Sequence, residues 1–312
     1  MNDYDLIIVG AGPAGLTGAL YAGRSMLRTV VLEKGVPGGE LLNTDLIEDY
    51  PGFESVRGCD LAEKMTAHAL KFGAQLVTDG VVSVEKQADG RFHVATDSGA
   101  AYRAPVVLLT AGGTPIKLGV PGEIEYAGKG VSYCAVCDGH FFRGEVLAVV
   151  GGGDAAAEEA GFLTRYATKV HLTHRRDQLR ASKIIQQRLF ENPKVEVIWD
   201  TVVDRIEGHN GAVKQLALRH VKTGATSALP VGGVFVFIGF RPNTGLVRGH
   251  VEHDAAGYFI TDEVMMTSIP GLFAAGDVRA QLTRQVTTAV GDATTAVIAA
   301  TRYLAELKGR RD

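Results

Sequence analysis

The fold is decided by residues 5–15, DLIIVGAGPAG, an apolar run that ends in a glycine-rich turn. Its glycines fit the pattern G-x-G-x-x-G. In that pattern the first glycine permits a tight turn, the second lets a pyrophosphate approach the backbone, and the third lets a helix pack on the strand. The free N–H groups of the helix N-terminus attract the phosphates. The residues expected at a dinucleotide are Gly10, Gly12, Pro13, Ala14 and Gly15.

An acidic residue lies where the second strand of this unit should end. We expect a helix of small residues over 11–23 and a second strand over Thr29–Glu33. Glu33 follows Gly10 by 23 residues, a position at which a carboxylate accepts hydrogen bonds from ribose hydroxyls. Glycine-rich turns are common by themselves. The combination of strand, helix and acid in register predicts a dinucleotide site.

The same arrangement occurs a second time in the chain. Residues 146–151, VLAVVG, predict a strand, which a helix to about Leu163 and a strand at Lys169–Thr173 should follow. This repeat indicates an internal duplication of the βαβ unit. The second fingerprint has alanine at the third glycine position, and its expected nucleotide-binding residues are Gly151, Gly153, Asp154, Ala155 and Ala156.

The second unit reverses the charge at the end of its second strand. Counting 23 residues from Gly151 leads to His174, and Arg175, Arg176 and Arg180 follow. A carboxylate there would repel a 2′-phosphate, whereas guanidinium groups bind it in a forked geometry. The alternative is a solvated basic strand end. The position relative to the fingerprint favours NADP(H), while the acid of the first unit suits FAD, so the pair of sites indicates a flavin-dependent oxidoreductase.

The remaining periodicity predicts an α/β fold with two Rossmann-like FAD/NAD(P)-binding domains, the NADPH domain inserted into the FAD domain. A long helical pattern occurs at about 285–307. Further strand-like runs occur at 76–85, 92–96, 106–110, 195–199, 214–220 and 233–238. Proline and glycine interrupt the chain near 112–122 and 239–244. We therefore expect a discontinuous FAD-binding domain of residues 1–115 and 245–312, and an NADPH-binding domain of residues 116–244.

The composition is that of a globular nucleotide-binding protein. Glycine accounts for 39 of the 312 residues, a larger share than the average of roughly 7%, and the glycines are not periodic. A formal charge of −3 provides no electrostatic reason to bind nucleic acid or an anionic membrane. The N-terminus is acidic, whereas a secretory signal begins with basic residues, so no such signal is expected. No run of about 18 apolar residues occurs, so no membrane span is expected. The expected location is the cytoplasm.

Two cysteines form a C-x-x-C motif, Cys134-Ala135-Val136-Cys137, followed by Asp138. A zinc site needs four ligands, and Cys59 stands alone, so no metal is expected. A redox dithiol is the favoured interpretation, because the motif closes a short disulfide ring that opens readily. Asp138 is either a turn residue or an acid that delivers a proton to a departing thiolate. Cys59 is expected to be an unreactive structural thiol, and Trp199 a packing residue.

Together these features resemble the bacterial low-molecular-weight thioredoxin reductases over essentially the whole chain. Four stretches carry the resemblance: Val131–Gly139 around the cysteines, His174–Arg180 at the phosphate, Phe273–Val278, and Arg284–Val286. The resemblance implies that Cys134, Cys137 and Asp138 are catalytic, with Cys137 closer to the flavin. It also implies further FAD-binding residues, namely Gly39, Glu40, Leu41, Asp49, Gly276, Asp277, Arg284, Gln285 and Val286.

The activity that this resemblance implies is NADPH-dependent. Electrons would pass from NADPH through FAD and the cysteine pair to the disulfide of a thioredoxin or thioredoxin-like protein. The family forms homodimers and rotates its NADPH domain relative to its FAD domain. Four positions depart from the family pattern: Glu40 and Asp49 stand where glutamine and asparagine are usual, and Ala111 and Phe240 replace a threonine and a histidine. These acids would act on the flavin environment.

Other functions are compatible with part of the pattern. A reductase for another small disulfide protein is the nearest alternative. The flavoprotein of an alkyl hydroperoxide-reducing system normally carries an extra N-terminal domain, a ferredoxin-driven relative would lack the arginine motif, and a ferredoxin–NADP reductase would lack the cysteine pair. A flavin redox sensor without turnover would need no hydride donor, and the second nucleotide site argues against it.

Overall fold

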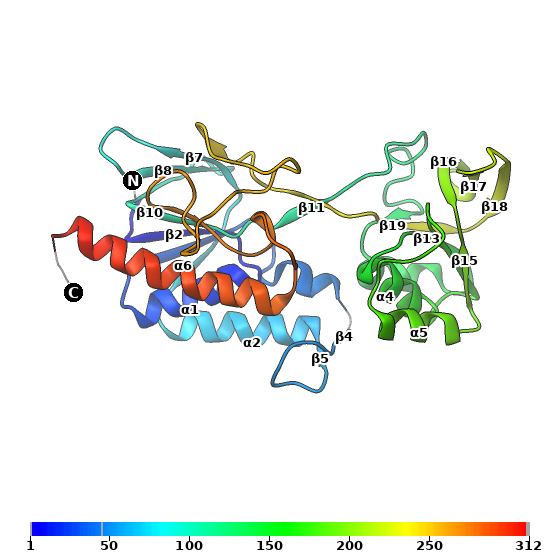
Figure 1. Cartoon of the computed structure of the whole chain (residues 1–312), viewed down its shortest axis with the longest axis horizontal. Coiled ribbons are helices and arrows are strands. Elements are labelled where there is room, and N and C mark those ends of the chain that lie inside the picture. The colour runs from blue at the N-terminus through cyan, green and yellow to red at the C-terminus, as the bar shows by residue number, and fades with distance from the viewer. Residues whose placement is uncertain (1, 45, 310–312) are drawn as a thin grey trace. The chain divides into compact units, whose positions relative to one another are not determined.

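The computed structural model of the chain describes residues 2–44 and 46–309. It divides into two compact units, Met1–Thr114 with Arg241–Asp312, and Pro115–Phe240. The chain therefore leaves the first unit, completes the second and returns (Figure 1). The two crossings contain the short strands β11 (Gly113–Pro115) and β20 (Phe240–Pro242), which pair with each other.

A five-stranded parallel sheet forms the centre of the first unit. Its strand order is β22-β10-β2-β3-β6, with bounds Leu272–Ala274, Val106–Leu109, Leu6–Val9, Thr29–Glu33 and Gln75–Thr78. All residues of β2 and β10 are buried. Such strands read as continuous apolar runs because layers cover both faces of the sheet.

Helices cover one face of this sheet (Figure 1), namely α1 (Pro13–Arg24), α2 (Gly58–Lys71) and α6 (Val286–Leu307). Leu6 and Ile8 of β2 point into the apolar core beneath α1 and α6. The approach of α1 is close, since a Cβ at Gly18 would lie 2.8 Å from Leu108 Cδ2. The absence of a side chain at Gly18 thus lets α1 pack closely against the sheet.

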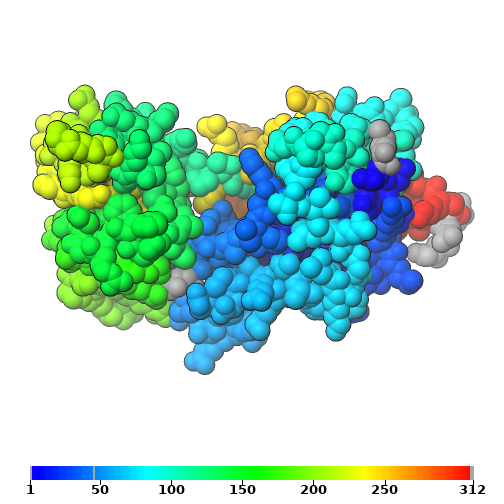
Figure 2. Space-filling view, turned by 180° about the vertical axis from the view of Figure 1, so that it is seen from behind, coloured from blue at the N-terminus to red at the C-terminus, as the bar shows by residue number. Residues whose placement is uncertain are grey.

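A second sheet covers the opposite face of the first unit (Figure 1). Its order is β1-β9-β8-β7-β21, with bounds Asn2–Asp3, Ala101–Ala104, Phe92–Thr96, Val81–Lys86 and Val247–Arg248. Ile7 and Val9 pack against this layer, because side chains of a strand alternate between faces. Figure 2 shows the segment η1 (Gly39–Asn43), β4 (Leu46–Ile47) and β5 (Val56–Arg57), in blue, at the surface of the first unit.

The second unit repeats this arrangement. Its parallel sheet has the order β12-β19-β13-β14-β15, with bounds Val131–Ser132, Gly233–Phe237, Val146–Gly151, Lys169–Thr173 and Val195–Ile198. Leu147 and Val149 face a core with α4 (Asp154–Leu163), whereas Ala148 and Val150 face the opposite one. The structure thus has two α/β halves built on the same plan, which confirms the predicted fold class.

The rest of the second unit covers the two faces of its sheet. The antiparallel strands β16 (Thr201–His209), β17 (Ala212–His220) and β18 (Thr226–Pro230) lie on one face. The helices are α3 (Ala135–Asp138), α4 and α5 (Lys183–Glu191), with a 3-10 turn η2 (Gly139–Phe142). The strand β12, which leads into α3, is an edge strand of the sheet and pairs with β19.

Two predictions about local structure were wrong in detail. The run 76–85 is two strands, β6 and β7, because Asp79 and Gly80 separate them and the chain changes sheet there. The first helix begins at Pro13 rather than at residue 11, because Gly12 is still extended as the N-cap. The other predicted strands coincide with observed ones, and α6 begins one residue later than expected.

Candidate functional site

Two glycines of the first fingerprint are required by packing. Gly10 has φ +101°, a left-handed conformation, and a Cβ there would lie 2.6 Å from Thr110 O. A Cβ at Gly15 would lie 1.9 Å from Gly10 O. Thr110 Oγ1 lies 2.9 Å from both Val9 O and Gly10 O, and its one hydrogen can be donated to either of them. The turn between β2 and α1 is therefore tight and admits no side chain at either glycine.

The middle glycine differs from its neighbours, because its Cβ position is open. A Cβ at Gly12 would meet only Gly39 Cα, at 3.9 Å. Gly12 is the N-cap of α1, Pro13 occupies the first turn, and no side chain caps the helix. The free N–H groups of that turn thus remain available. This cradle fits an anionic pyrophosphate, because the backbone is approachable on the side where a dipole favours negative charge.

Glu33 is folded back onto the same turn. Its Oε2 accepts the Ala11 N–H at 2.6 Å, and its Oε1 accepts the Gly35 N–H at 2.9 Å. Parallel pairing of β2 with β3 places the end of β3 beside the turn after β2. The structure thus brings Glu33 to the fingerprint, as its spacing from Gly10 predicts.

The motif around Gly276 also lies against the first fingerprint. Gly276 follows β22 and begins the 3-10 turn η3 (Gly276–Val278) with φ +72°. A Cβ on it would lie 3.1 Å from the Cβ of Ala14. Asp292 of α6 accepts the Gly276 N–H at 3.1 Å and pairs with Arg279 at 3.1 Å. Segments 260 residues apart in the chain therefore form one site.

Acidic side chains interact at this site. Burial raises the pKa of Glu40, a hydrogen bond from Asn43 (3.1 Å) lowers it, and the charge of Asp277 raises it. Burial also raises the pKa of Asp277, the Arg284 charge lowers it and the Asp292 charge raises it. Glu40 is exposed as a whole residue, yet its carboxyl group is in surroundings that disfavour its charge. The glutamate at position 40 is thus an acid whose pKa responds to its burial and to the charge of Asp277.

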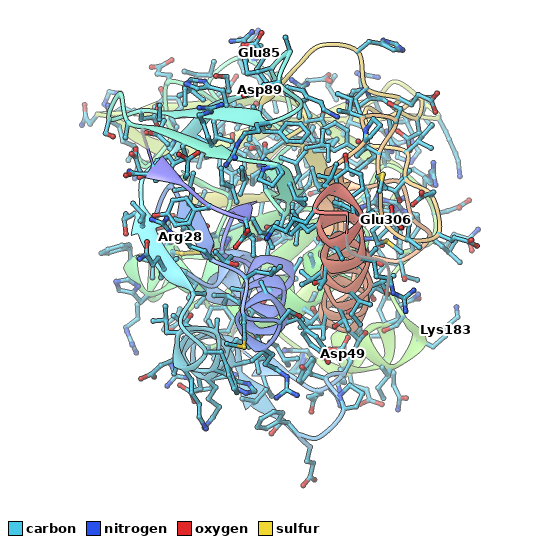
Figure 3. All side chains as sticks on the ribbon, turned by 90° about the vertical axis from the view of Figure 1, so that its left-hand side faces the viewer. Arg28, Asp49, Glu85, Asp89, Lys183 and Glu306 are labelled. Carbon is cyan, nitrogen blue, oxygen red and sulfur yellow. A yellow bond between two sulfur atoms is a disulfide. The ribbon has the colours of Figure 1, made fainter. Side chains whose placement is uncertain are left out.

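The segments at 39–41 and 284–286 meet through a small apolar cluster. Leu41 is buried in it, and Val286 packs against it at the start of α6. Gln285 is the N-cap of α6 and forms a capping box with Thr288. The Arg284 guanidinium lies 4.0 Å from the centroid of the Tyr258 ring. Asp49, in contrast, lies exposed in the loop between β4 and β5 (Figure 3).

The second fingerprint has two closed glycine positions and one open one. A Cβ at Gly151 would lie 2.3 Å from Phe237 O, and a Cβ at Gly152 would lie 2.2 Å from the His174 ring. Nothing lies within 4 Å of a Cβ at Gly153, the N-cap of α4. No role was predicted for Gly152 from the sequence. Gly152 is required because the His174 ring packs against it, and this contact between distant residues cannot be recognised from the spacing of the fingerprint.

The basic cluster follows directly after β14. His174 is buried against Gly152 and packs edge-on to Trp199, so Trp199 is a packing residue as expected. Burial lowers the pKa of His174, which keeps its ring neutral at physiological pH. Arg175, Arg176 and Arg180 are exposed, and the Arg180 N–H donates to Gly152 O at 2.7 Å. The cluster therefore borders the open end of the second fingerprint.

The cysteine pair lies on the short helix after β12. Cys134 and Cys137 form a disulfide, with their Cα atoms 5.3 Å apart. The Cys137 N–H lies 3.1 Å from Cys134 Sγ. Asp138 ends the helix and accepts a hydrogen bond from Ser132 Oγ at 2.6 Å. Ser132 lies two residues before Cys134, within the motif Val131–Gly139, but no role was predicted for it from the sequence. Cys59, expected to be a structural thiol, is exposed and forms no disulfide.

Within residues 2–44 and 46–309, no group of three or more histidine, cysteine, aspartate or glutamate side chains could hold a metal ion. No helix within the same residues has the length and apolar character needed to cross a membrane.

The chain resembles known proteins over nearly its full length. A family model described as pyridine nucleotide-disulphide oxidoreductase matches residues 4–293. A thioredoxin reductase of Listeria innocua is 47% identical over 306 residues, which cover 98% of this chain and 95% of that protein. One of Bacillus subtilis is 45% identical over 306 residues, 98% of this chain and 96% of that protein. The crystal structure of Lactococcus lactis thioredoxin reductase matches with TM-score 0.95 and 42% identity, covering 97% of this chain and 99% of that one.

Proposed function

The chain belongs to the pyridine nucleotide-disulphide oxidoreductase family, within it to the low-molecular-weight bacterial thioredoxin reductases, and we propose that it uses NADPH and FAD to reduce a thioredoxin through the Cys134–Cys137 disulfide. One observation carries this proposal. A single chain combines two nucleotide cradles of opposite charge with a closed C-x-x-C disulfide. Neither a simple dehydrogenase nor a flavin-binding module needs all three.

FAD is assigned to the first unit. The N–H groups at the start of α1 would bind its pyrophosphate, and Glu33 would exchange its backbone partners for ribose hydroxyls. Asp277 is supported by its position beside Gly276, which approaches Ala14. The other residues assigned to FAD are Gly10, Gly12, Pro13, Gly15, Gly39, Glu40, Leu41, Asp49, Arg284, Gln285 and Val286. Bound FAD would supply the transfer of electrons from the nicotinamide to the disulfide.

NADPH is assigned to the second unit. The start of α4, with Gly153 open, supports a pyrophosphate there as in the first unit. The exposed Arg175, Arg176 and Arg180 would bind the 2′-phosphate, and His174 would position the loop by packing on Gly152. The remaining residues assigned to NADPH are Gly151, Asp154, Ala155 and Ala156.

The cysteine pair would pass two electrons to the protein substrate by thiol–disulfide exchange. One thiolate attacks the substrate disulfide and forms a mixed disulfide, which the second thiolate breaks, so that Cys134–Cys137 is oxidised and the substrate is reduced. Per turnover, NADPH, one proton and one substrate disulfide give NADP⁺ and two thiols. Asp138, directly after Cys137, would donate a proton to the sulfur that leaves when the enzyme disulfide opens.

We also propose that the chain acts as a homodimer in the cytoplasm on a thioredoxin or thioredoxin-like protein. The names of the relatives support the kind of partner. The mixed surface charge expected from a formal net charge of −3 offers no reason for nucleic acid as a partner.

The proposed function predicts that purified protein reconstituted with FAD oxidises NADPH when a thioredoxin disulfide is supplied. The rate should follow the appearance of free thiols with a stoichiometry of two thiols per NADPH. A panel of host disulfide proteins separates thioredoxin from other small partners. NADPH oxidation that no disulfide protein accelerates would contradict the proposal, and a preference for a different small protein would assign that protein as substrate.

A pair of glycine substitutions tests the FAD assignment. Gly12→Ala should leave the fold intact but weaken FAD binding by about tenfold or more, because the new Cβ faces open space where the pyrophosphate would lie. Gly15→Ala is the matched control for packing, and should lower the free energy of unfolding by about 1–3 kcal/mol through its collision with Gly10 O. Thermal unfolding of apoprotein and flavin titration separate the effects. Unchanged FAD affinity in Gly12→Ala would exclude the cradle.

A further inference from the structure

A buried hydroxyl joins the backbone of one cysteine to the carboxylate of Asp138. Ser132 is only 4% exposed. Its Oγ donates to Asp138 Oδ2 at 2.6 Å and accepts the Cys134 N–H at 3.1 Å. A hydroxyl has one hydrogen and two lone pairs, so both bonds can exist together. Cys134 O also lies 3.2 Å from Oγ, but Asp138 Oδ2 is the closer acceptor and takes the hydrogen.

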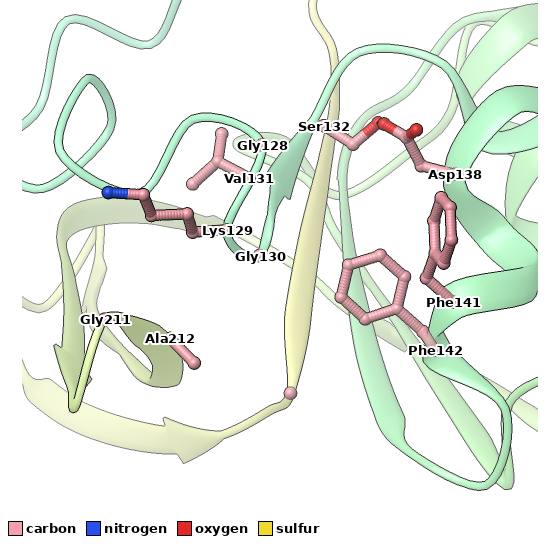
Figure 4. A pocket seen from close by; sticks show the side chains of 11 residues that line it. Gly128, Lys129, Gly130, Val131, Ser132, Asp138, Phe141, Phe142, Gly211 and Ala212 are labelled. Carbon is pink, nitrogen blue, oxygen red and sulfur yellow. The ribbon is translucent and has the colours of Figure 1, made fainter.

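The two ends of this hydrogen-bond chain differ in rigidity. Ser132 belongs to β12, where it pairs with Phe235 of the buried strand β19. Asp138 ends a helix of four residues, which has too few internal hydrogen bonds to orient a side chain by itself. Figure 4 shows Ser132 and Asp138 pointing toward each other from these separate elements. The sheet thus orients the carboxylate through the serine.

Asp138 and Ser132 also line a cavity of about 390 Å³, together with Lys129, Phe141 and Phe142 (Figure 4). Water in this cavity would have access to the carboxylate. The acid could therefore recover from solvent a proton that it has donated to a sulfur.

We propose that Ser132 is a positioning residue for the redox reaction: its hydroxyl holds the carboxyl group of Asp138 and the Cys134 backbone in the arrangement that proton transfer to the departing sulfur requires. This inference rests on the proposed function. When the disulfide accepts two electrons, the S–S bond breaks, one sulfur takes the Asp138 proton, and the Ser132 hydrogen bond stabilises the carboxylate left behind. The electrons come from NADPH, and water returns the proton to Asp138.

The test compares Ser132→Ala with Ser132→Thr in the FAD-loaded full-length protein. Ser132→Ala should lower kcat for thioredoxin reduction by about tenfold to a hundredfold, because it removes a hydrogen bond to a charged group. The KM for thioredoxin and the rate of flavin reduction by NADPH in stopped flow should stay unchanged. Ser132→Thr keeps the hydroxyl and should recover most of kcat.

A double-mutant cycle with Asp138→Asn identifies the route of the effect. If Ser132 acts through Asp138, Ser132→Ala should cause little further loss in the Asp138→Asn background. Equal losses in both backgrounds, or wild-type kcat in Ser132→Ala, would overturn the inference. The inference would also be overturned if Ser132→Thr lost as much kcat as Ser132→Ala while both variants kept the wild-type unfolding temperature.

Two controls keep the outcomes apart. If Ser132→Ala does not fold, the comparison is made between Ser132→Thr, which keeps the hydroxyl, and Ser132→Gly, which removes it. Equal kcat values for these two variants would overturn the inference. Wild-type protein that fails to reduce any disulfide protein would instead contradict the proposed function.

Discussion

Replacing either Cys134 or Cys137 with serine will abolish thioredoxin reduction and leave the reduction of bound flavin by NADPH intact. Each variant lacks one sulfur of the disulfide, so neither can store the two electrons that the substrate requires. We expect turnover to fall on the order of 10³-fold or more, as when an essential nucleophile is removed. The measurements are thiol release from thioredoxin at steady state and anaerobic flavin bleaching by NADPH.

The third cysteine provides the matched control for this prediction. Cys59 is exposed and outside the disulfide, so Cys59→Ser should retain wild-type turnover. Substantial thioredoxin reduction by both single-cysteine variants would remove the pair from the mechanism. A loss of flavin reduction in the same variants would show that the substitutions damage more than the dithiol.

Neutralising Arg175 and Arg176 together will weaken NADPH binding far more than NADH binding. Only NADPH has the 2′-phosphate, and two charge-assisted contacts of about 1.5–3 kcal/mol each are at risk. Because both arginines are exposed, solvent screening reduces this sum, and we expect the KM for NADPH to rise roughly a hundredfold. Steady-state kinetics with each nucleotide measure the change in preference.

The matched control for the arginine variant is another exposed arginine of the same unit. Arg205 lies on β16 and its side chain is 61% exposed, so Arg205→Gln removes a charge at a different place. It should change the two KM values little and equally. An equal loss of NADPH and NADH binding in the Arg175/Arg176 variant would refute the phosphate role.

The central strands of the two parallel sheets could be predicted because their physical signal is local. All residues of Leu6–Val9, and all but the first of Val146–Gly151, are buried, so each strand appears in the sequence as an uninterrupted apolar run. The fingerprint glycines were equally recognisable, since Gly10 needs a positive φ and Gly15 has no room for a Cβ. These strands and glycines can therefore be recognised from the local sequence pattern alone.

Other features depend on contacts that distant parts of the chain make. The helix α2 was not predicted, because only four of its residues are buried and they do not form a long apolar run. The role of Ser132 depends on the hydrogen bond between its hydroxyl and Asp138 at the end of β12, and the periodicity of the sequence does not indicate such a contact. The interaction of Glu40 with Asp277 likewise joins segments far apart in the chain.

The order in which the ribosome releases the chain follows from the two crossings. Strand β10 of the first unit emerges before the whole of Pro115–Phe240, whereas its neighbour β22 and the helix α6 emerge afterwards. At roughly 5–20 residues per second, the outer unit waits several seconds or longer with that edge of its sheet uncovered. During synthesis, the inserted unit can thus fold first, and the outer unit becomes complete only when its last helix arrives.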